Sequence, residues 1–206
     1  MGPVHTVDRV LLVRHGATRW SSAHRHTGRT DVPLNAEGEG QASALAPRLA
    51  AVVAAGPVAV LVSPLVRARR TAELAGLEPF ELDDDLVEWD YGTYEGMTTA
   101  QIRSQAPGWT VFTQPCPGGE SAEQVSARCD RVLGRLSALD PSTTVILVAH
   151  SHLLRSLAAR WLGRPVADGG MLELSVGSTS VLGSEHDGPT LRHWNMANPL
   201  TADPLS

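Results

Sequence analysis

The sequence predicts an α/β fold, in which helices cover both faces of a mostly parallel sheet in a three-layer α/β/α sandwich. Three short apolar runs, at residues 10–13, 58–62 and 145–149, are typical of strands that are buried on both faces. Longer segments with helical periodicity separate these runs, and strands that alternate with helices favour parallel pairing. Because 42% of the 206 residues are hydrophobic, one well-buried domain over residues 1–206 is the simplest prediction.

The helices expected between the strands follow from apolar residues spaced three or four positions apart, which share one helical face. The segments with this spacing are residues 37–53, 120–139 and 155–162. Ser121 stands near the start of the second segment, where a serine side chain caps free backbone N–H groups. A shorter helix is predicted around residues 99–105.

Two segments depart from this alternation of strands and helices. Residues 92–119 hold three prolines and several glycines, and we interpret this stretch as a lid-like insertion. Residues 171–194 hold short strand-like runs, broken at Gly177 and at the sequence HDGP in residues 186–189. Because such breaks are typical of turns between paired strands, this tail predicts a hairpin at an edge of the sheet.

Charge and composition exclude several classes of protein. The net charge is -5 and all 17 basic residues are arginine, which argues against a nucleic-acid surface and excludes a catalytic lysine. Two cysteines form no disulfide framework, so a cytoplasmic location is expected. No apolar run approaches the length that crosses a membrane, and the first residues, MGPVHTVDR, lack the apolar core of a secretory signal.

Each predicted strand ends in polar residues. Arg14 and His15 follow the first strand, Ser63 and Arg67 follow the second, and residues 150–152, His-Ser-His, follow the third. Because parallel strands end at one edge of a sheet, where α/β folds bind ligands, these side chains should converge. Arginine binds phosphate oxygens, and histidine near neutral pH attacks or exchanges protons. The set predicts an anion pocket that holds a nucleophile, with a transferring phosphoryl group as its natural occupant.

Phosphoryl transfer also requires an acid for the leaving oxygen. The stretch DDDLVEWDYGTYEG, residues 83–96, supplies several carboxyl groups. Glu88 lies between the apolar residues Val87 and Trp89, and burial there would favour the protonated form that an acid needs. Asp90 is the second candidate for this role.

These residues belong to an ordered set of motifs that covers nearly the whole chain. The motifs are VRHGATRW from residue 13, HTGRTDVPLNAEGEGQA from 26, SPLVRARRTA from 63, EWDYGTYEGMT from 88, PGGES from 117 and VAHSHLLR from 148. In this order the set resembles the histidine phosphatase superfamily, also called phosphoglycerate mutase-like. The pattern is most similar to bacterial acid phosphatases and sugar-bisphosphate phosphatases of that superfamily.

The resemblance implies a metal-independent phosphatase without a cofactor, which hydrolyses a small phosphomonoester such as a sugar phosphate. It implies that His15 becomes a phosphohistidine and that Glu88 protonates the leaving group and then activates water. Phosphate binding is assigned by the resemblance to Arg14, Arg67 and His150. The substrate end of the pocket is assigned by position to Thr18, Ser21, Thr27 and Gly28. The resemblance also implies a homodimer.

Three details of the motifs separate this chain from parts of the superfamily. Ser21 stands where the mutases usually have asparagine. Residues 97–118 contain one basic residue, Arg103, whereas the mutases carry a longer basic insertion that holds a bisphosphorylated cofactor. Ser151 stands where the family usually has glycine, and a positive φ at that position would strain a serine.

Four alternatives remain open from the sequence. A phosphoglycerate mutase that depends on a bisphosphorylated cofactor, or a non-catalytic member that only binds phosphorylated ligands, would share these motifs. A serine hydrolase would use Ser151 between a strand and a helix, although the flanking glycines of that motif are absent. A metal hydrolase would use two H-x-H pairs, His24 with His26 and His150 with His152.

Overall fold

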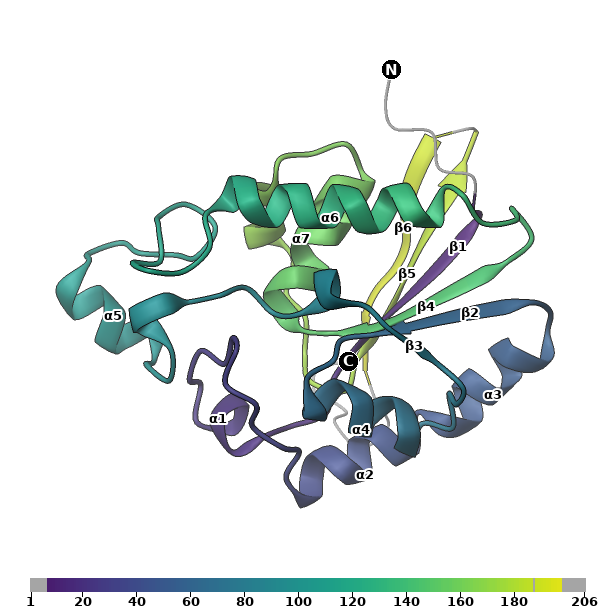
Figure 1. The fold of residues 1–206 in the computed structure, drawn as a ribbon, viewed down its shortest axis with the longest axis horizontal. Coiled ribbons are helices and arrows are strands. Elements are labelled where there is room, and N and C mark those ends of the chain that lie inside the picture. The colour runs from purple at the N-terminus through teal and green to yellow at the C-terminus, as the bar shows by residue number, and fades with distance from the viewer. Residues whose placement is uncertain (1–6, 187, 198–206) are drawn as a thin grey trace.

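The fold is built on one six-stranded sheet, which we describe from a computed structural model that covers residues 7–186 and 188–197 (Figure 1). The strands are β1 (Arg9–Arg14), β2 (Val58–Val62), β3 (Glu81–Leu82), β4 (Thr144–Ala149), β5 (Thr179–Glu185) and β6 (Gly188–Met196), in the spatial order β3-β2-β4-β1-β5-β6. Strands β1 to β4 pair in parallel, and β5 runs antiparallel to its neighbours β1 and β6. The predicted mostly parallel sheet and its edge hairpin are therefore confirmed.

Helices cover both faces of this sheet, which confirms the predicted sandwich. The helices are α1 (Arg19–Ser22), α2 (Ala36–Ala44), α3 (Ala46–Ala54), α4 (Val66–Leu74), α5 (Thr99–Gln105), α6 (Ala122–Leu136) and α7 (Ser151–Trp161), with 3-10 turns η1 (Asp84–Leu86), η2 (Gly92–Tyr94) and η3 (Val166–Met171). Figure 1 shows α6 and α7 on one side of the sheet and α2, α3 and α4 on the other. None of the helices in the described residues is long and apolar enough to cross a bilayer.

Two apolar cores, one on each face of the sheet, explain the continuous apolar runs in the sequence. Along β1, Leu12 packs in the core that contains residues of α6 and α7. Its neighbours Leu11 and Val13 pack in the other core, with residues of α3 and α4. Because successive side chains of a strand point to opposite faces, a strand covered on both sides has to be apolar at every position.

One predicted helix, residues 37–53, is in fact two helices. The chain breaks between α2 and α3 at Leu45, shortly before Pro47. Proline has no amide hydrogen and its ring clashes with the carbonyl four residues earlier, which here belongs to Ser43, so the helix cannot continue through it. The same proline is tolerated in the first turn of α3, where amide groups lack helical partners.

Other helix boundaries follow from local capping. Ser121 caps α6 as expected, and Gln124 completes the capping box by accepting a hydrogen bond from the Ser121 amide. Helix α7 begins at Ser151, four residues before the predicted segment. Ser151 does not have a positive φ, since the non-glycine residues with positive φ in the described chain are His24, His186 and Asn195. The strain considered for a serine at this position therefore does not arise.

A close approach of two backbone segments makes glycine necessary next to the carboxyl end of β1. A Cβ atom added at Gly38 would lie 2.0 Å from the carbonyl oxygen of Ala17, and one added at Gly16 would lie 2.3 Å from the carbonyl oxygen of Gly38. Both contacts involve rigid backbone, so a side chain at either position requires the segments to separate. Glycine at these positions lets α2 pack directly against the turn that follows β1.

We predict that Gly38→Ala lowers the free energy of unfolding by about 1–3 kcal/mol, the usual cost of overpacking, in urea denaturation. Gly134→Ala in α6 is the matched control, because an added Cβ there meets no atom within 4 Å. The control should gain about 0.5–1 kcal/mol, since alanine is the better helix former. Equal stability of Gly38→Ala and the wild type would contradict the close approach.

Candidate active site

The carboxyl ends of β1, β4 and β2 bring polar residues together, as the strand directions predicted. The His15 amide donates to the Ala149 carbonyl and the Ser63 amide donates to the Val148 carbonyl, each at 3.0 Å, so the chains stay paired just beyond the strands. His150 follows β4 directly. The rings of His15 and His150 lie 5.1 Å apart, and His150 Nε2 lies 2.7 Å from Ser63 Oγ.

His15 is buried and held in one tautomer. Its Nδ1 lies 2.7 Å from the carbonyl oxygen of Gly16, and because a carbonyl only accepts, Nδ1 carries the proton. Burial, with the charges of Arg67 and Arg14, lowers the pKa of His15 well below its ordinary value. The ring is therefore neutral at pH 7, and Nε2 offers a free lone pair, which is the state a histidine nucleophile needs.

Arg14 presents an unpaired donor in the same pocket. Its Nη1 donates to the Leu174 carbonyl, while its Nε is buried with no hydrogen-bond partner among the described residues. Burial lowers the pKa of Arg14 to about 10, although the charge of Glu88 opposes this, so the group stays cationic at pH 7. A buried cationic N–H without a partner is costly, and an oxyanion ligand removes that cost.

Arg67 is fully buried and holds three other parts of the chain. Its Nε donates to His150 Nδ1 at 3.1 Å. Its Nη1 donates to the Thr30 carbonyl at 3.0 Å, and its Nη2 donates to the carbonyls of Thr27 at 3.1 Å and Gly28 at 2.9 Å. Most donors of the guanidinium are thus used within the protein. Because His150 Nδ1 accepts, the proton of that ring lies on Nε2, which donates it to Ser63 Oγ.

Within the described chain, neither Arg14 nor Arg67 forms an ion pair with a carboxylate. Burial and the charge of Arg67 also lower the pKa of His150 well below its ordinary value. The site therefore combines two cationic guanidinium groups with two neutral imidazoles. Arg14 and His15 line its cavity, whereas Arg67 and His150 are fully buried and are not among the lining residues. Such a pocket suits an anion more than an uncharged ligand.

Glu88 is buried, 4% exposed, at the first turn of α7. Its Oε1 accepts from the amides of Trp89 and Leu153, each at 2.9 Å, and its Oε2 accepts from the amide of His152 at 3.1 Å. The expected burial is present, but the sequence did not reveal these donors. These three donors fix the position of the carboxyl group beside the start of α7. They also satisfy amides at the start of α7 that have no partner within the helix.

The four residues assigned to the substrate end lie in different places. A cavity of about 260 Å³ is lined by Arg14, His15, Ser21, His24, Arg25, His26, Thr27, Glu88, Tyr91, Thr99, Ser151 and His152. Thr18 does not line this cavity, because it is fully buried and its Oγ1 caps α1 by accepting from the Ser21 amide. Gly28 does not line it either. Its carbonyl faces Arg67, and a Cβ there would lie 2.6 Å from the Trp89 carbonyl.

The sequence analysis missed His26 and Thr99 as cavity residues. His26 Nε2 lies 3.1 Å from Thr99 Oγ1, and its ring contacts Tyr91 and Trp109, with centroids 4.9 and 5.2 Å apart. The His26 amide donates to the Met97 carbonyl at 2.9 Å. A histidine in a loop carries no sequence signal for these contacts, because they depend on where residues 92–119 fold back.

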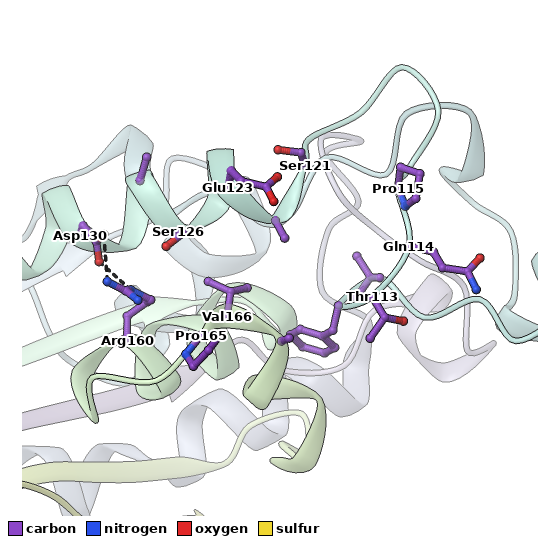
Figure 2. Close-up of a pocket in the computed structure, with 15 residues that line it drawn as sticks. Thr113, Gln114, Pro115, Ser121, Glu123, Ser126, Asp130, Arg160, Pro165 and Val166 are labelled. Carbon is purple, nitrogen blue, oxygen red and sulfur yellow. Dashed lines mark hydrogen bonds and ion pairs between the residues drawn. The ribbon is translucent and has the colours of Figure 1, made fainter.

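A larger cavity of about 740 Å³ lies between α6 and the segment at residues 111–115 (Figure 2). Arg160, the one arginine in its lining, forms an ion pair with Asp130 at 2.8 Å. Because this cavity offers no unpaired positive charge in its lining, its size does not make it the anion site.

The geometry does not support two of the alternatives. No three His, Cys, Asp or Glu side chains within residues 7–186 and 188–197 are grouped as metal ligands. In the H-x-H pairs, His26 is bonded to Thr99, and His152 Nδ1 lies 2.5 Å from Tyr91 Oη. Ser151, the nucleophile of a serine hydrolase, has no hydrogen bond to a histidine in the described structure.

Together with the relatives named below, this fold and this anion pocket identify an enzyme that hydrolyses phosphomonoesters. Residues 10–197 match the model of the histidine phosphatase superfamily (branch 1), and the chain belongs to that superfamily.

Three comparisons place the chain among its relatives. It is 42% identical over 178 residues to an acid phosphatase of Mycobacterium tuberculosis, across 86% of this chain and 87% of that protein. It is 32% identical over 184 residues to the sedoheptulose 1,7-bisphosphatase of Saccharomyces cerevisiae, across 75% of this chain and 68% of that protein. A solved structure of an open reading frame of Mycobacterium tuberculosis matches with a TM-score of 0.87 at 40% identity, covering 93% of this chain and 98% of that chain.

The buried His26 generates a prediction about stability and pH. Burial lowers its pKa from 6.5 to about 4, so the unfolded chain binds more protons than the folded chain between these values. The buried, neutral His26 leaves the free energy of unfolding unreduced above pH 6.5, and this free energy falls as the pH is lowered toward 4. We predict that His26 lowers the free energy of unfolding by up to about 1.4 kcal/mol per pH unit in this window.

Urea denaturation at several pH values in this window would measure the slope. His26→Asn should show a shallower fall of stability with acidification than the wild type, because the titrating group is gone. The exposed His193, replaced by Asn, is the control and should keep the wild-type slope. Equal slopes in His26→Asn and the wild type would contradict the prediction.

Proposed function

We propose that the phosphomonoester is hydrolysed through a phosphohistidine on His15. The observation that carries the proposal is the pairing of a neutral His15, with its free Nε2, and Arg14, with its buried unpaired Nε. A neutral imidazole attacks phosphorus, and the guanidinium stabilises the oxygens that gain charge in the transition state. Little other chemistry is required, since phosphoryl transfer depends on positioning and charge stabilisation.

The reaction proceeds in two steps. His15 Nε2 attacks phosphorus in line, the bond to the ester oxygen breaks, and Glu88 gives a proton to the departing alcohol. Water then attacks the phosphohistidine and gives a proton to Glu88, which releases inorganic phosphate and restores His15. During both steps Arg14 and the remaining N–H of Arg67 bind the equatorial oxygens. The Nε2–H of His150, which is hydrogen-bonded to Ser63 Oγ in the free enzyme, exchanges that partner for a third phosphate oxygen.

We propose a sugar phosphate or a related metabolite as the substrate. The cavity is lined in part by Ser21, Thr27 and Thr99, three residues with hydroxyl groups, and such a polar lining suits a hydroxylated carbon chain. The relationship to a sugar bisphosphatase supports the same class. A mutase is disfavoured, because Arg103 is the one basic residue in residues 97–118 and its Nε is used by the Trp109 carbonyl.

The lid role of residues 92–119 is part of this proposal. Gly96 and Met97 are hydrogen-bonded to the backbone of His26 at 2.8 and 2.9 Å, which brings the insertion to the wall of the cavity. A single domain over 1–206, a cytoplasmic location and a homodimer stay predictions from the sequence, whose first six residues lie outside those described. Light scattering of the purified chain would test the homodimer.

We predict that His15→Ala loses phosphate release by about a thousandfold or more, because the nucleophile is gone. The assay uses sugar mono- and bisphosphates, p-nitrophenyl phosphate and 3-phosphoglycerate, with EDTA present. The exposed His193→Ala on β6 is the control and should release phosphate at the wild-type rate. Near-normal turnover by His15→Ala would overturn the mechanism, and loss of wild-type activity in EDTA would restore the metal hydrolase.

Glu88→Gln tests the acid. We predict a loss of about 10²–10⁴-fold in kcat for sugar phosphates, whose alcohol leaving group needs a proton. The loss for p-nitrophenyl phosphate should be much smaller, because nitrophenolate leaves without an acid. Because Glu88 also binds amides at the start of α7, thermal denaturation of the variant has to show an intact fold. Equal losses for both substrates would move the acid role elsewhere, to Asp90 first.

A further inference from the structure

Tyr91 and His152 form a hydrogen-bonded pair that the two chemical steps do not use. Tyr91 Oη and His152 Nδ1 lie 2.5 Å apart, and Tyr91 is 1% exposed. His152 is the second residue of α7. Both side chains line the 260 Å³ cavity together with His15 and Glu88.

The direction of this hydrogen bond follows from the surroundings of the phenol. Tyr91 Oη has no other hydrogen-bond partner in the described structure, so an accepting phenol would leave its own buried proton without an acceptor. The phenol therefore donates to Nδ1. Burial raises the pKa of Tyr91 and lowers the pKa of His152, each well away from its ordinary value, so both groups are neutral at pH 7. A neutral ring that accepts at Nδ1 carries its proton on Nε2.

The Nε2–H of His152 is free to bind a ligand. It has no hydrogen-bond partner in the described residues, and it is not among their buried unpaired atoms, so it reaches open space. The side chain is 17% exposed. Its ring contacts His26 and Phe112, with centroids 5.8 and 5.3 Å apart, which fixes its orientation. It also lines a neighbouring cavity of about 350 Å³.

His152 lies beside the carboxyl group that would protonate the leaving oxygen. Its own amide donates to Glu88 Oε2 at 3.1 Å, and its Nδ1 lies 4.0 Å from the same oxygen. When the alcohol departs next to Glu88, the carbon atoms beside its oxygen therefore lie near the His152 imidazole. A neutral N–H donor suits an uncharged oxygen, such as a hydroxyl group, on those carbons.

We propose that His152 is a specificity-determining residue, whose Nε2–H donates to a hydroxyl oxygen of the leaving alcohol, and that Tyr91 is a positioning residue that holds this tautomer. The substrate class is then a phosphomonoester of a polyol or sugar with a hydroxyl group near the ester. The inference rests on the proposed function, because it assigns the leaving-group side of the same pocket.

Three variants of His152 separate the donor from its ring. His152→Phe keeps an aromatic ring without a donor, His152→Gln can place an N–H near the position of Nε2, and His152→Asn places one near Nδ1. For a sugar phosphate, kcat/KM of His152→Phe should fall by about three- to tenfold more than for p-nitrophenyl phosphate, mainly through KM, the range expected for one neutral hydrogen bond. His152→Gln should recover part of this loss and His152→Asn should not. The exposed His193→Gln is the control.

Nitrogen-15 chemical shifts of the His152 ring in the full chain test the tautomer itself. The wild type should show a protonated Nε2 and an unprotonated Nδ1, and Tyr91→Phe should shift the ring toward a mixture of both forms. A protonated Nδ1 in the wild type would overturn the role of Tyr91. An equal loss on both substrates in His152→Phe would overturn the specificity role and leave a structural one.

A binding experiment separates this inference from the proposed mechanism. In the His15→Ala background no phosphohistidine forms, so calorimetry reports binding of a sugar phosphate directly. Adding His152→Phe should weaken that binding about three- to tenfold, with a smaller effect on inorganic phosphate, which has no leaving alcohol. If turnover shows no phosphohistidine but this difference holds, the mechanism fails and the inference stands. If the two ligands weaken equally, the inference fails.

Discussion

The buried guanidinium of Arg67 is the interaction on which the rest of the site depends. It lies in α4 on the other side of the sheet from α7, yet its donors reach His150 after β4 and the carbonyls of Thr27, Gly28 and Thr30. A buried cation is costly unless each of its donors finds an acceptor. Chain segments far apart in sequence therefore have to meet around it. The loop at residues 27–30 is tied a second time, because Glu95 accepts from the amides of Gly28 and Thr30.

Hydrogen bonds to backbone and to buried partners decide the proton positions in the pocket. The Gly16 carbonyl leaves the lone pair of His15 on Nε2, Arg67 leaves the proton of His150 on Nε2, and Tyr91 does the same for His152. Burial lowers the pKa of all three rings, so the positive charge of the pocket resides on arginine. Because the rings are neutral and the arginines are cationic, the histidines can react or donate hydrogen bonds while the guanidinium groups bind a negatively charged ligand.

The chemistry of the site was more accessible to sequence reasoning than its walls. Arg14 is the last residue of β1, His15 directly follows β1 and His150 directly follows β4. Because parallel strands end at one edge of the sheet, their meeting follows from topology. Thr18 and Gly28 stand in equally recognisable motifs but do not line the cavity. Thr18 caps a helix, and the carbonyl of Gly28 accepts a hydrogen bond from Arg67. The capping of α7 by Glu88 joins residues 64 positions apart, and local patterns do not report such contacts.

The sequence by itself determined the three central strands β1, β2 and β4, the edge hairpin and the polar residues at the strand ends, because strands covered on both faces appear as continuous apolar runs. It did not predict the short edge strand β3, whose two exposed residues form no such run. It also contained the break before Pro47, which follows from the missing amide hydrogen of proline. The tertiary structure alone decided which histidine nitrogens carry protons, which arginine donors stay free and how His26 and Tyr91 reach the cavity. These properties depend on distances between segments that only packing brings together, and hydrogen bonding and burial change steeply with such distances.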